Sequence, residues 1–495
     1  MRRDAIGRRL PPLVVALAVV AVYAFTFSET YAWSDDYARL NAPSSSFVED
    51  TSGGRPIAAP LMAFAFRAAR SISGLRYLRA VSVLGVALLA ASLAATLQHD
   101  GRTGNYAAFV AVTSALLPTF QMYTGWATAY LFPWVCLLSL WSGRLWLDAH
   151  RASVRAVGFA GFVIANLIYQ PGAFFAWVIP AVRLSQRLDR PDEGPRLVGR
   201  LLVATIAGAA VALVAAWCVT LVVDVAWKQR AGFVHSVGDV ESKIAWIVSR
   251  VLVIGARPFL IGSPSPAAAL ATAGPAFLLL AYDWTTRATG TLAQRIATIG
   301  LLVVVPVFAI LPNAVVRENQ IEFRILAGSC VAMWCSLCAS ASVVSQRAAR
   351  ALRIDRRHAS RIAGAAQLLF IAIVAVVCRR HVFETMIVPN QIKDAFIATE
   401  LRRFDPARHA RIVVVNDPDW WGRTRRIGTF SLVSDLALSW VPAPDVELKA
   451  REAGIDTAAA PVTVATRADP KHEELLVDLS PLRAAIGSRG RDAAR

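Results

Sequence analysis

The sequence predicts a polytopic α-helical membrane protein, and its composition and the pattern of its apolar runs are the reasons. The chain has 495 residues, of which 56% are apolar and 17% are charged, and its mean hydropathy is +0.48. A soluble multidomain protein of this length is much less apolar. The apolar residues form long runs, and the arginines cluster in short loops between them, so we expect about 11 transmembrane helices.

The charge and the cysteines fit this class of protein. The formal net charge of +18 could indicate a nucleic-acid partner, but the arginines follow the loops rather than one face of a globular domain. We therefore predict membrane lipids as partners and no nucleic acid. All six cysteines lie in or beside apolar runs, which predicts no disulfide framework.

The first apolar run, 11–27, sets the expected orientation. Four arginines precede it, which places the N-terminus in the cytoplasm and the next loop, 29–77, outside; they are Arg2, Arg3, Arg8 and Arg9. A cleaved signal peptide is the alternative, but the run has no clear small-x-small site and many apolar runs follow. Within the loop, 56–73 is apolar but contains Arg67 and Arg70, which predicts a helix lying in the membrane interface.

Later apolar runs predict the remaining spans. They lie at about 79–98, 106–118, 127–147, 157–169, 174–182, 201–225, 267–281, 296–311, 325–344 and 362–378. Segment 244–261 is interrupted by Arg250 and Pro258 among others, so we predict that it is interfacial or re-entrant. This assignment leaves the arginine-rich loop 346–361 inside. Heavy use of Gly, Ala and Arg with little Lys is typical of bacteria, so we expect a multi-pass protein of the bacterial inner membrane.

The composition becomes more polar from about His381 onward. We therefore divide the chain into a membrane region, 1–380, and a soluble C-terminal domain, 381–495, on the outer (periplasmic or extracellular) face. Arg411–Val415 and Pro461–Ala465 resemble buried strands, and 387–403 has helical spacing. These patterns predict a small α/β domain.

Two adjacent acids, Asp35 and Asp36, follow the first apolar run at the expected membrane surface. Neighbouring side chains diverge in a helix or a strand, so one acid is expected to be a general base and the other its orienter, a metal ligand or a sugar contact. Two carboxylates this close should raise the pKa of one of them. The alternative is that Ser34 and Asp35 only cap a short helix.

Nearby residues favour a ligand site. Trp33 and Tyr37 flank the acids with rings that can stack on a sugar, although an interfacial aromatic belt would use the same residues. The Gly53-Gly54 pair lets the backbone approach Arg55 and a ligand closely.

These features together resemble a known family. An Asp-Asp pair after the first span, Gly54-Arg55-Pro56 before an interfacial helix, and the turn Tyr169-Gln170 are similar to the GT-C glycosyltransferases, most of all to the O-antigen-conversion glucosyltransferase family. The resemblance implies a polyprenyl-phosphate sugar, such as a glucose donor, and a lipid-linked or cell-surface glycan as acceptor. It also implies that Asp35 and Asp36 lie at the catalytic centre.

Transfer from a lipid phosphate would need cations, because the leaving phosphate gains negative charge. Arg55, Arg317 and Arg324 are the candidates, and snorkelling at a helix end is the alternative for the last two. A weaker group comprises Lys228, Arg230, His235, Lys243 and Arg250. Glu49 and Asp50 are candidates for contacting an acceptor or a cation, but a solvated loop is the alternative that the sequence favours for them. The sequence predicts no definite cofactor and leaves a divalent cation open.

Two other functions compete with a transferase. A transporter or lipid flippase usually has ionisable residues near the membrane midplane, whereas the predicted spans here contain few acids. A scaffold for another enzyme would leave the Asp35 and Asp36 pair without a role. The sequence therefore favours an enzyme that acts at the membrane surface.

Overall fold

The computed structural model describes residues 10–186, 188, 192–228, 232–261, 265–319, 321–416, 441–466 and 473–482. Arg230 and the four N-terminal arginines of the predicted orientation signal lie outside these residues.

The described chain is mostly helical, and five of its helices are long and apolar enough to cross a membrane. They are α6 (Leu75–His99), α13 (Glu193–Val222), α16 (Pro266–Arg287), α19 (Ala327–Ala351) and the run that joins α20 (Arg356–Val382) to α21 (Val388–Leu401). Shorter apolar helices are α2 (Leu10–Ser28), α5 (Ala58–Ala69), α10 (Ala152–Ile168) and α17 (Leu292–Phe308). This is the architecture of a helical membrane protein, as predicted.

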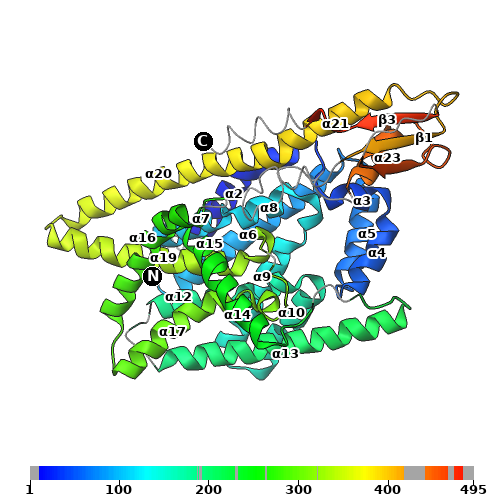
Figure 1. Ribbon diagram of the computed structural model, residues 1–495. Coiled ribbons are helices and arrows are strands. Elements are labelled where there is room, and N and C mark those ends of the chain that lie inside the picture. The colour runs from blue at the N-terminus through cyan, green and yellow to red at the C-terminus, as the bar shows by residue number, and fades with distance from the viewer. Residues whose placement is uncertain are drawn as a thin grey trace.

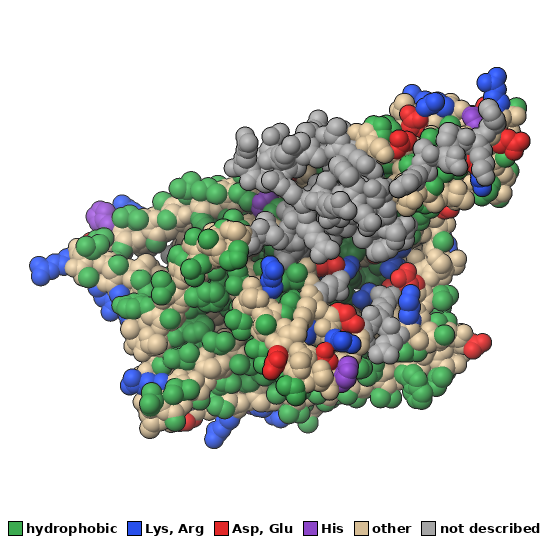
Figure 2. All heavy atoms as spheres, viewed as in Figure 1, with side chains coloured by type: hydrophobic (Ala, Val, Ile, Leu, Met, Phe, Trp, Pro, Cys, Tyr) green, Lys and Arg blue, Asp and Glu red, His purple; other side chains and the backbone are tan. Residues whose placement is uncertain are grey.

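Short elements complete the helical body. They are α3 (Asp35–Asn41), α4 (Pro43–Ser52), α7 (Gly104–Ala115), α8 (Pro118–Gly125), η1 (Ala127–Ala129), α9 (Phe132–Asp148), α11 (Gln170–Ala173), η2 (Phe175–Trp177), α12 (Val178–Gln186), α14 (Val237–Trp246), η3 (Ile247–Val251), α15 (Leu252–Ala256), α18 (Leu311–Ala314), η4 (Phe323–Ile325) and η5 (Phe383–Ile387). Hydrophobic side chains cover much of this body in Figure 2.

Several predicted segments have different ends in the structure. The predicted span 106–118 ends early at Ala115, and α8 starts anew at Pro118, because proline has no N–H for a continuing helix. The predicted interfacial segment 56–73 contains a helix of only 12 residues, α5, which stops at the left-handed Arg70. The interrupted segment 244–261 contains a helix with a π-turn at Ile247–Val251, which includes Arg250.

The C-terminal part of the described chain contains a three-stranded parallel sheet in the order β2-β1-β3. The strands are β1 (Arg411–Val415), β2 (Val462–Ala465) and β3 (Glu474–Asp478), and Ile412 pairs with Val462 on one side and Leu475 on the other. Helices α21 and α23 (Pro442–Glu452) pack on it through one apolar cluster. Both predicted strands are present, but β2 is an edge strand and is not buried as expected. Strand β3 was not predicted from the sequence.

We call α21, α23 and the three strands the C-terminal unit. Helices α20 and α21 form one helical run of 45 residues from Arg357 to Leu401, with the π-turn η5 between them. The boundary proposed at 380/381 falls inside this run. Figure 1 shows the run crossing the whole molecule and ending at the sheet, where α23 lies against α3.

Candidate functional site

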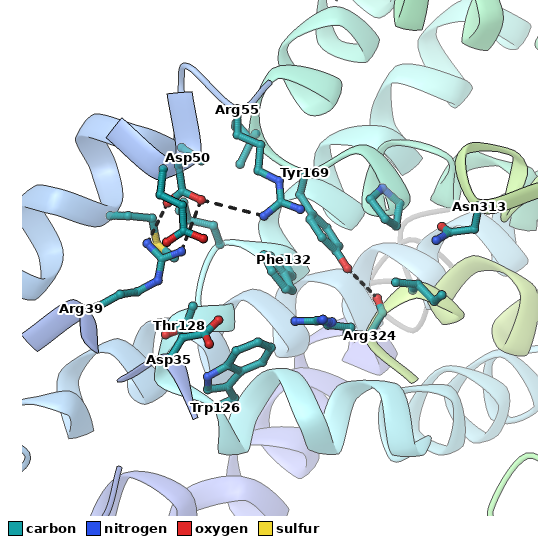
Figure 3. Close-up of a pocket in the computed structure, with 17 residues that line it drawn as sticks. Asp35, Arg39, Asp50, Arg55, Trp126, Thr128, Phe132, Tyr169, Asn313 and Arg324 are labelled. Carbon is teal, nitrogen blue, oxygen red and sulfur yellow. Dashed lines mark hydrogen bonds and ion pairs between the residues drawn. The ribbon is translucent and has the colours of Figure 1, made fainter. Parts of the chain in front are cut away.

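A polar pocket of about 220 Å³ lies where the loop after α2 meets the turn after α10 and the segment η4 (Figure 3). Its charged lining residues are Asp35, Arg39, Glu49, Asp50, Arg55 and Arg324. Its other lining residues are Ala58, Met62, Trp126, Thr128, Leu131, Phe132, Ile168, Tyr169, Pro171, Asn313 and Ile325. The pocket thus brings together six residues that the sequence singled out, namely Asp35, Glu49, Asp50, Arg55, Tyr169 and Arg324.

The two adjacent acids have different surroundings. Asp36 is fully buried, and its Oδ1 accepts hydrogen bonds from the backbone N–H (2.8 Å) and the hydroxyl (2.7 Å) of Thr128, while its Oδ2 accepts one from the Trp33 N–H (3.1 Å). Asp35 lines the pocket. Among the described residues, its one hydrogen bond comes from the Ser34 hydroxyl at 3.4 Å. Asp36 is therefore a fixed anchor, and Asp35 is the acid available to a ligand.

Burial raises the pKa of Asp36 to about 6, although the hydrogen bonds from Thr128 and Trp33 and the charge of Arg79 oppose the rise. A raised pKa was expected for one of the acids, but its cause is burial rather than repulsion between the two carboxylates. The capping alternative fails for Ser34, whose side chain makes no capping hydrogen bond to α3. Instead Ser34 has the unusual φ of 55°, a backbone conformation that is often found at functional sites.

Arg79 fixes the chain that leads into α3. This arginine is fully buried, and its guanidinium donates to the carbonyls of Thr26 (2.7 Å), Tyr31 (2.9 Å) and Glu29 (2.9 Å). It also lies over the Tyr31 ring at 4.0 Å. The sequence pattern marks Arg79 only as the start of a span, because the three carbonyls that it bonds lie about 50 residues earlier in the chain.

An ion pair joins the two short helices beside the pocket. Arg39 of α3 and Asp50 of α4 form two hydrogen bonds, of 2.7 and 3.3 Å, and both side chains are nearly buried. Asp50 Oδ1 lies 3.9 Å from Nη1 of Arg55. Asp50 therefore holds arginines at the edge of the pocket, and its predicted contact with an acceptor or a cation stays a prediction.

Arg55 follows a turn that needs glycine at one position. Gly54 has φ of +78°, and a Cβ there would lie 3.2 Å from the Trp227 ring. Gln170 donates from Nε2 to the Gly54 carbonyl at 3.0 Å, and its Oε1 lies 3.5 Å from Nε of Arg55. Gln170 thus supports the turn and does not line the pocket, while Tyr169 lines it and places its ring 5.5 Å from the Arg55 guanidinium.

Arg324 lines the pocket from η4, a segment far along the chain from the first loop. Its carbonyl accepts hydrogen bonds from the hydroxyls of Tyr123 (2.6 Å) and Tyr169 (3.1 Å), which fix the short segment η4. Its guanidinium pairs with Glu322 and lies 5.2 Å from the centre of the Trp126 ring. Figure 3 shows Arg55 and Arg324 reaching into the same space, with Asp35 at its edge.

Besides Asp36 and Gln170, three more predicted site residues do not line the pocket. Trp33 is buried behind it, edge-on against Trp126 at 5.2 Å. Tyr37 points to the opposite side of α3 from Asp35, because residues two apart on a helix lie on nearly opposite faces. Arg317 is largely exposed, and its Nε lies 3.3 Å from Asp239.

Some pocket residues were not foreseen from the sequence. Trp126, Thr128 and Asn313 line the pocket from segments far from the first loop, and no local pattern marks them. The Asn313 Oδ1 is buried and has no hydrogen-bond partner among the described residues, and such an orphaned acceptor indicates a place for a polar ligand. Lys243, from the weaker group of predicted cations, donates to the carbonyls of Asn313 (3.3 Å) and Glu318 (3.1 Å) and so holds this segment.

A metal site is not evident in the described part of the chain. Within those residues, no group of three or more His, Cys, Asp and Glu side chains could hold a metal ion. In comparisons with known proteins, no family model matches the chain and no curated protein matches it significantly. The function of the chain is therefore inferred from the pocket and from the chemistry of its residues.

Proposed function

We propose that the protein is a membrane glycosyltransferase that moves a sugar, such as glucose, from a polyprenyl-phosphate donor to a lipid-linked or cell-surface glycan. The observation that supports this most is that Asp35, Arg55 and Arg324 all line one pocket. A lightly bonded carboxylate can accept a proton, and two guanidinium groups can hold a phosphate. The GT-C resemblance of the sequence supplies the class of donor.

The proposed reaction is a displacement at the anomeric carbon of the sugar. Asp35 takes the proton of the acceptor hydroxyl as the acceptor oxygen forms its bond to that carbon. The bond from the carbon to the phosphate oxygen breaks, and its electron pair leaves with the polyprenyl phosphate. Arg55 and Arg324 stabilise the negative charge that develops on this leaving group.

The rest of the pocket suits this role. Arg39 is held by Asp50 through two hydrogen bonds, whereas Arg55 lies 3.9 Å from Asp50. Arg324 has the acidic partner Glu322, and it lines the pocket together with Arg55. Phe132 stacks on Tyr169 with 3.7 Å between ring centres, and this pair gives the pocket a rigid aromatic wall. Asn313 offers an amide oxygen to a sugar hydroxyl.

The setting is part of the proposal. We place the protein in the bacterial inner membrane with about 11 membrane crossings and the pocket at the outer surface, as the apolar runs and arginine-rich loops predict. The donor's polyprenyl chain would then lie in the bilayer while its phosphate and sugar reach the pocket. A divalent cation is not required by this scheme, because the arginines supply the positive charge.

The test is transfer by membranes that contain the protein. Membranes from cells with and without the gene would receive a panel of radiolabelled polyprenyl-phosphate sugars, and the label in lipid-linked and surface glycans would be measured. We expect one sugar to be transferred only when the protein is present. If no sugar in the panel moves, the transferase proposal is wrong.

A second candidate function, a transporter or lipid flippase, has one observation in its favour. Asp283 of α16 is fully buried, pairs with Arg287 and accepts a hydrogen bond from the Ser340 hydroxyl of α19 at 2.8 Å. Buried ionisable residues inside spans are typical of transporters. The pair lies in the last turn of α16, however, and not near its middle. Movement of a labelled lipid across vesicles without sugar transfer would favour this alternative.

A further inference from the structure

Helix α3 lies between the pocket and the C-terminal unit. Asp35 at its start faces the pocket, and the opposite face contacts α21 and α23. On that face the Tyr37 hydroxyl lies 2.8 Å from Asp394 Oδ1. The Tyr37 ring lies 4.2 Å from Nζ of Lys393, which forms a completely buried ion pair with Asp445 at 2.9 Å.

A second group of contacts holds the end of α3. Asn41 donates from Nδ2 to the Pro444 carbonyl at 2.6 Å and lies 3.2 Å from a Glu447 carboxylate oxygen, while its Oδ1 accepts from Arg451 at 2.8 Å. Leu40 also belongs to an apolar cluster that includes Leu448 of α23. The C-terminal unit therefore contacts α3 at Tyr37, in the middle of the helix, and at Asn41, its last residue.

The helix depends on such contacts for its position. It has only seven residues, and isolated helices of this length are not stable in water. The residues proposed to bind phosphate depend on other supports: Gln170 holds the turn before Arg55, and two tyrosines hold the segment of Arg324. The C-terminal unit thus contacts the helix that carries Asp35 more directly than the segments that carry Arg55 and Arg324.

We propose that the C-terminal unit positions the general base, with Asp394 and Asn41 as positioning residues that act through α3. The proposal rests on the function proposed above. The C-terminal unit carries no recognised motif. Its proposed role is to hold Asp35 at the distance from the acceptor hydroxyl that proton transfer needs. A shift of about 1 Å in a reacting group can lower the rate by roughly a hundredfold.

The kinetic test compares kcat with KM for the polyprenyl-phosphate sugar. We expect Asp394→Ala and Asn41→Ala to lower kcat by about ten- to a hundredfold while KM stays within about twofold, because the arginines keep their supports. The matched control is Glu400→Ala, which removes a carboxylate from the same helix α21; Glu400 pairs with the exposed Arg403 at 2.7 Å and should leave both constants unchanged. If Asp394→Ala does not fold, Tyr37→Phe takes its place as the test variant. It removes the hydroxyl that contacts Asp394 Oδ1 and also that hydroxyl's 3.0 Å bond to the Ala32 carbonyl.

A structural test does not depend on activity. Hydrogen exchange of the backbone amides of α3 should become faster in Asp394→Ala than in the unmodified protein, whereas exchange in α10, which packs mainly on α9 and α13, should not change. Unchanged kcat together with unchanged exchange in α3 would overturn the positioning role. Absence of sugar transfer by the unmodified protein would refute the proposed function instead, and the exchange experiment would still show whether the C-terminal unit holds α3.

Discussion

At the scale of single residues, hydrogen bonds distinguish two adjacent acids that the sequence presents as equals. Asp36 accepts three hydrogen bonds in a fully buried position, so the hydroxyl of a substrate cannot reach it. Asp35 faces the pocket with one long bond from Ser34. A general base needs the position of Asp35, because the hydroxyl that it deprotonates must be able to reach it.

The first prediction is that Asp35→Asn removes most of the activity. Asparagine keeps the shape of the side chain but cannot accept the proton, and a general base typically contributes about 10²–10⁴ in rate. Transfer of labelled sugar at saturating donor would measure the loss, with protein level in the membrane as the control. An Asp35→Asn protein that transfers sugar at the normal rate would mean that Asp35 is not the base.

The second prediction concerns Asp36 and pH. Its pKa in the folded protein is about 6, above the ordinary value for aspartate, so the folded state binds more protons than the unfolded state between about pH 4 and 6. The stability that this provides is complete below about pH 4 and is lost as the pH rises through 6. The melting temperature of Asp36→Asn, which lacks the carboxyl, should therefore fall less than that of the unmodified protein as the pH rises from about 4 to 6.

Thermal unfolding in detergent at several pH values measures this effect. The size of the shift corresponds to about 3 kcal/mol in the free energy of unfolding. Asp35→Asn is the comparison variant at the neighbouring position, because its side chain is not buried in the same way. Equal pH dependence in the unmodified protein and in Asp36→Asn would show that Asp36 does not titrate in this range.

The third prediction separates the three candidate arginines. Arg55→Lys and Arg324→Lys keep a positive charge but lose the planar fork that binds two phosphate oxygens. Loss of one charge-assisted contact costs about 1.5–3 kcal/mol, or roughly ten- to a hundredfold in activity. Arg317→Lys is the matched control, since Arg317 lies outside the pocket beside Asp239. An equal loss in all three variants would argue against a specific phosphate site.

At the scale of elements, the apolar runs predicted most helices. The exact ends of the helices and the place of each strand in the sheet do not follow from hydropathy alone. The long helices α6, α13, α16 and α19 match predicted spans within several residues. The division between α7 and α8 follows from Pro118 and could have been predicted. The edge position of β2 could not, because it depends on which strands pair across the sheet.

The candidate site shows the same limit. Asp35, Arg55, Tyr169 and Arg324 were found because a short motif or an isolated charge at a loop marks them. Thr128 could not be found, because it contacts Asp36 across 92 positions of the chain and a threonine in an apolar region has no distinguishing pattern. Long-range contacts of this kind require the fold itself.

The fourth prediction belongs to the turn that precedes Arg55. Gly54 has φ of +78°, where a residue with a Cβ is disfavoured by about 1–2 kcal/mol. Gly54→Ala should therefore displace Arg55 from the pocket and raise KM for the donor. Gly53→Ala is the matched control, because Gly53 has φ of −84°. Similar kinetics for the two alanine variants would show that the turn tolerates a side chain and does not set the position of Arg55.

At the scale of the whole molecule, one helical run connects distant parts. The 45 residues from Arg357 to Leu401 extend over about 67 Å at 1.5 Å per residue. One end adjoins the arginine-rich loop after α19, and the other contributes Lys393 and Asp394 to the contacts with α3. The π-turn η5 lies between these ends, and such turns are frequent at functional positions in helices.

The whole-molecule arrangement constrains the topology without any count of spans. Because α23 contacts α3 directly, the C-terminal unit and the first loop must lie on the same side of the membrane. The loop between α19 and α20 lies at the other end of α20 from that contact (Figure 1). This loop is rich in arginine, so by the positive-inside rule it should be cytoplasmic, and the first loop should be outside.

The fifth prediction is therefore that single cysteines at positions 45 and 453 react with an impermeant maleimide in intact spheroplasts, whereas one at position 351 reacts only after the membrane is opened. All three positions are exposed, and Ser45→Cys, Ala453→Cys and Ala351→Cys would be made in a Cys218→Ser background, since Cys218 is the exposed natural cysteine. Labelling of 45 without 453 would contradict the contact between α3 and α23. Labelling of 351 alone would keep that contact but reverse the orientation, and the proposed pocket would then face the cytoplasm, where a donor at the outer surface could not reach it.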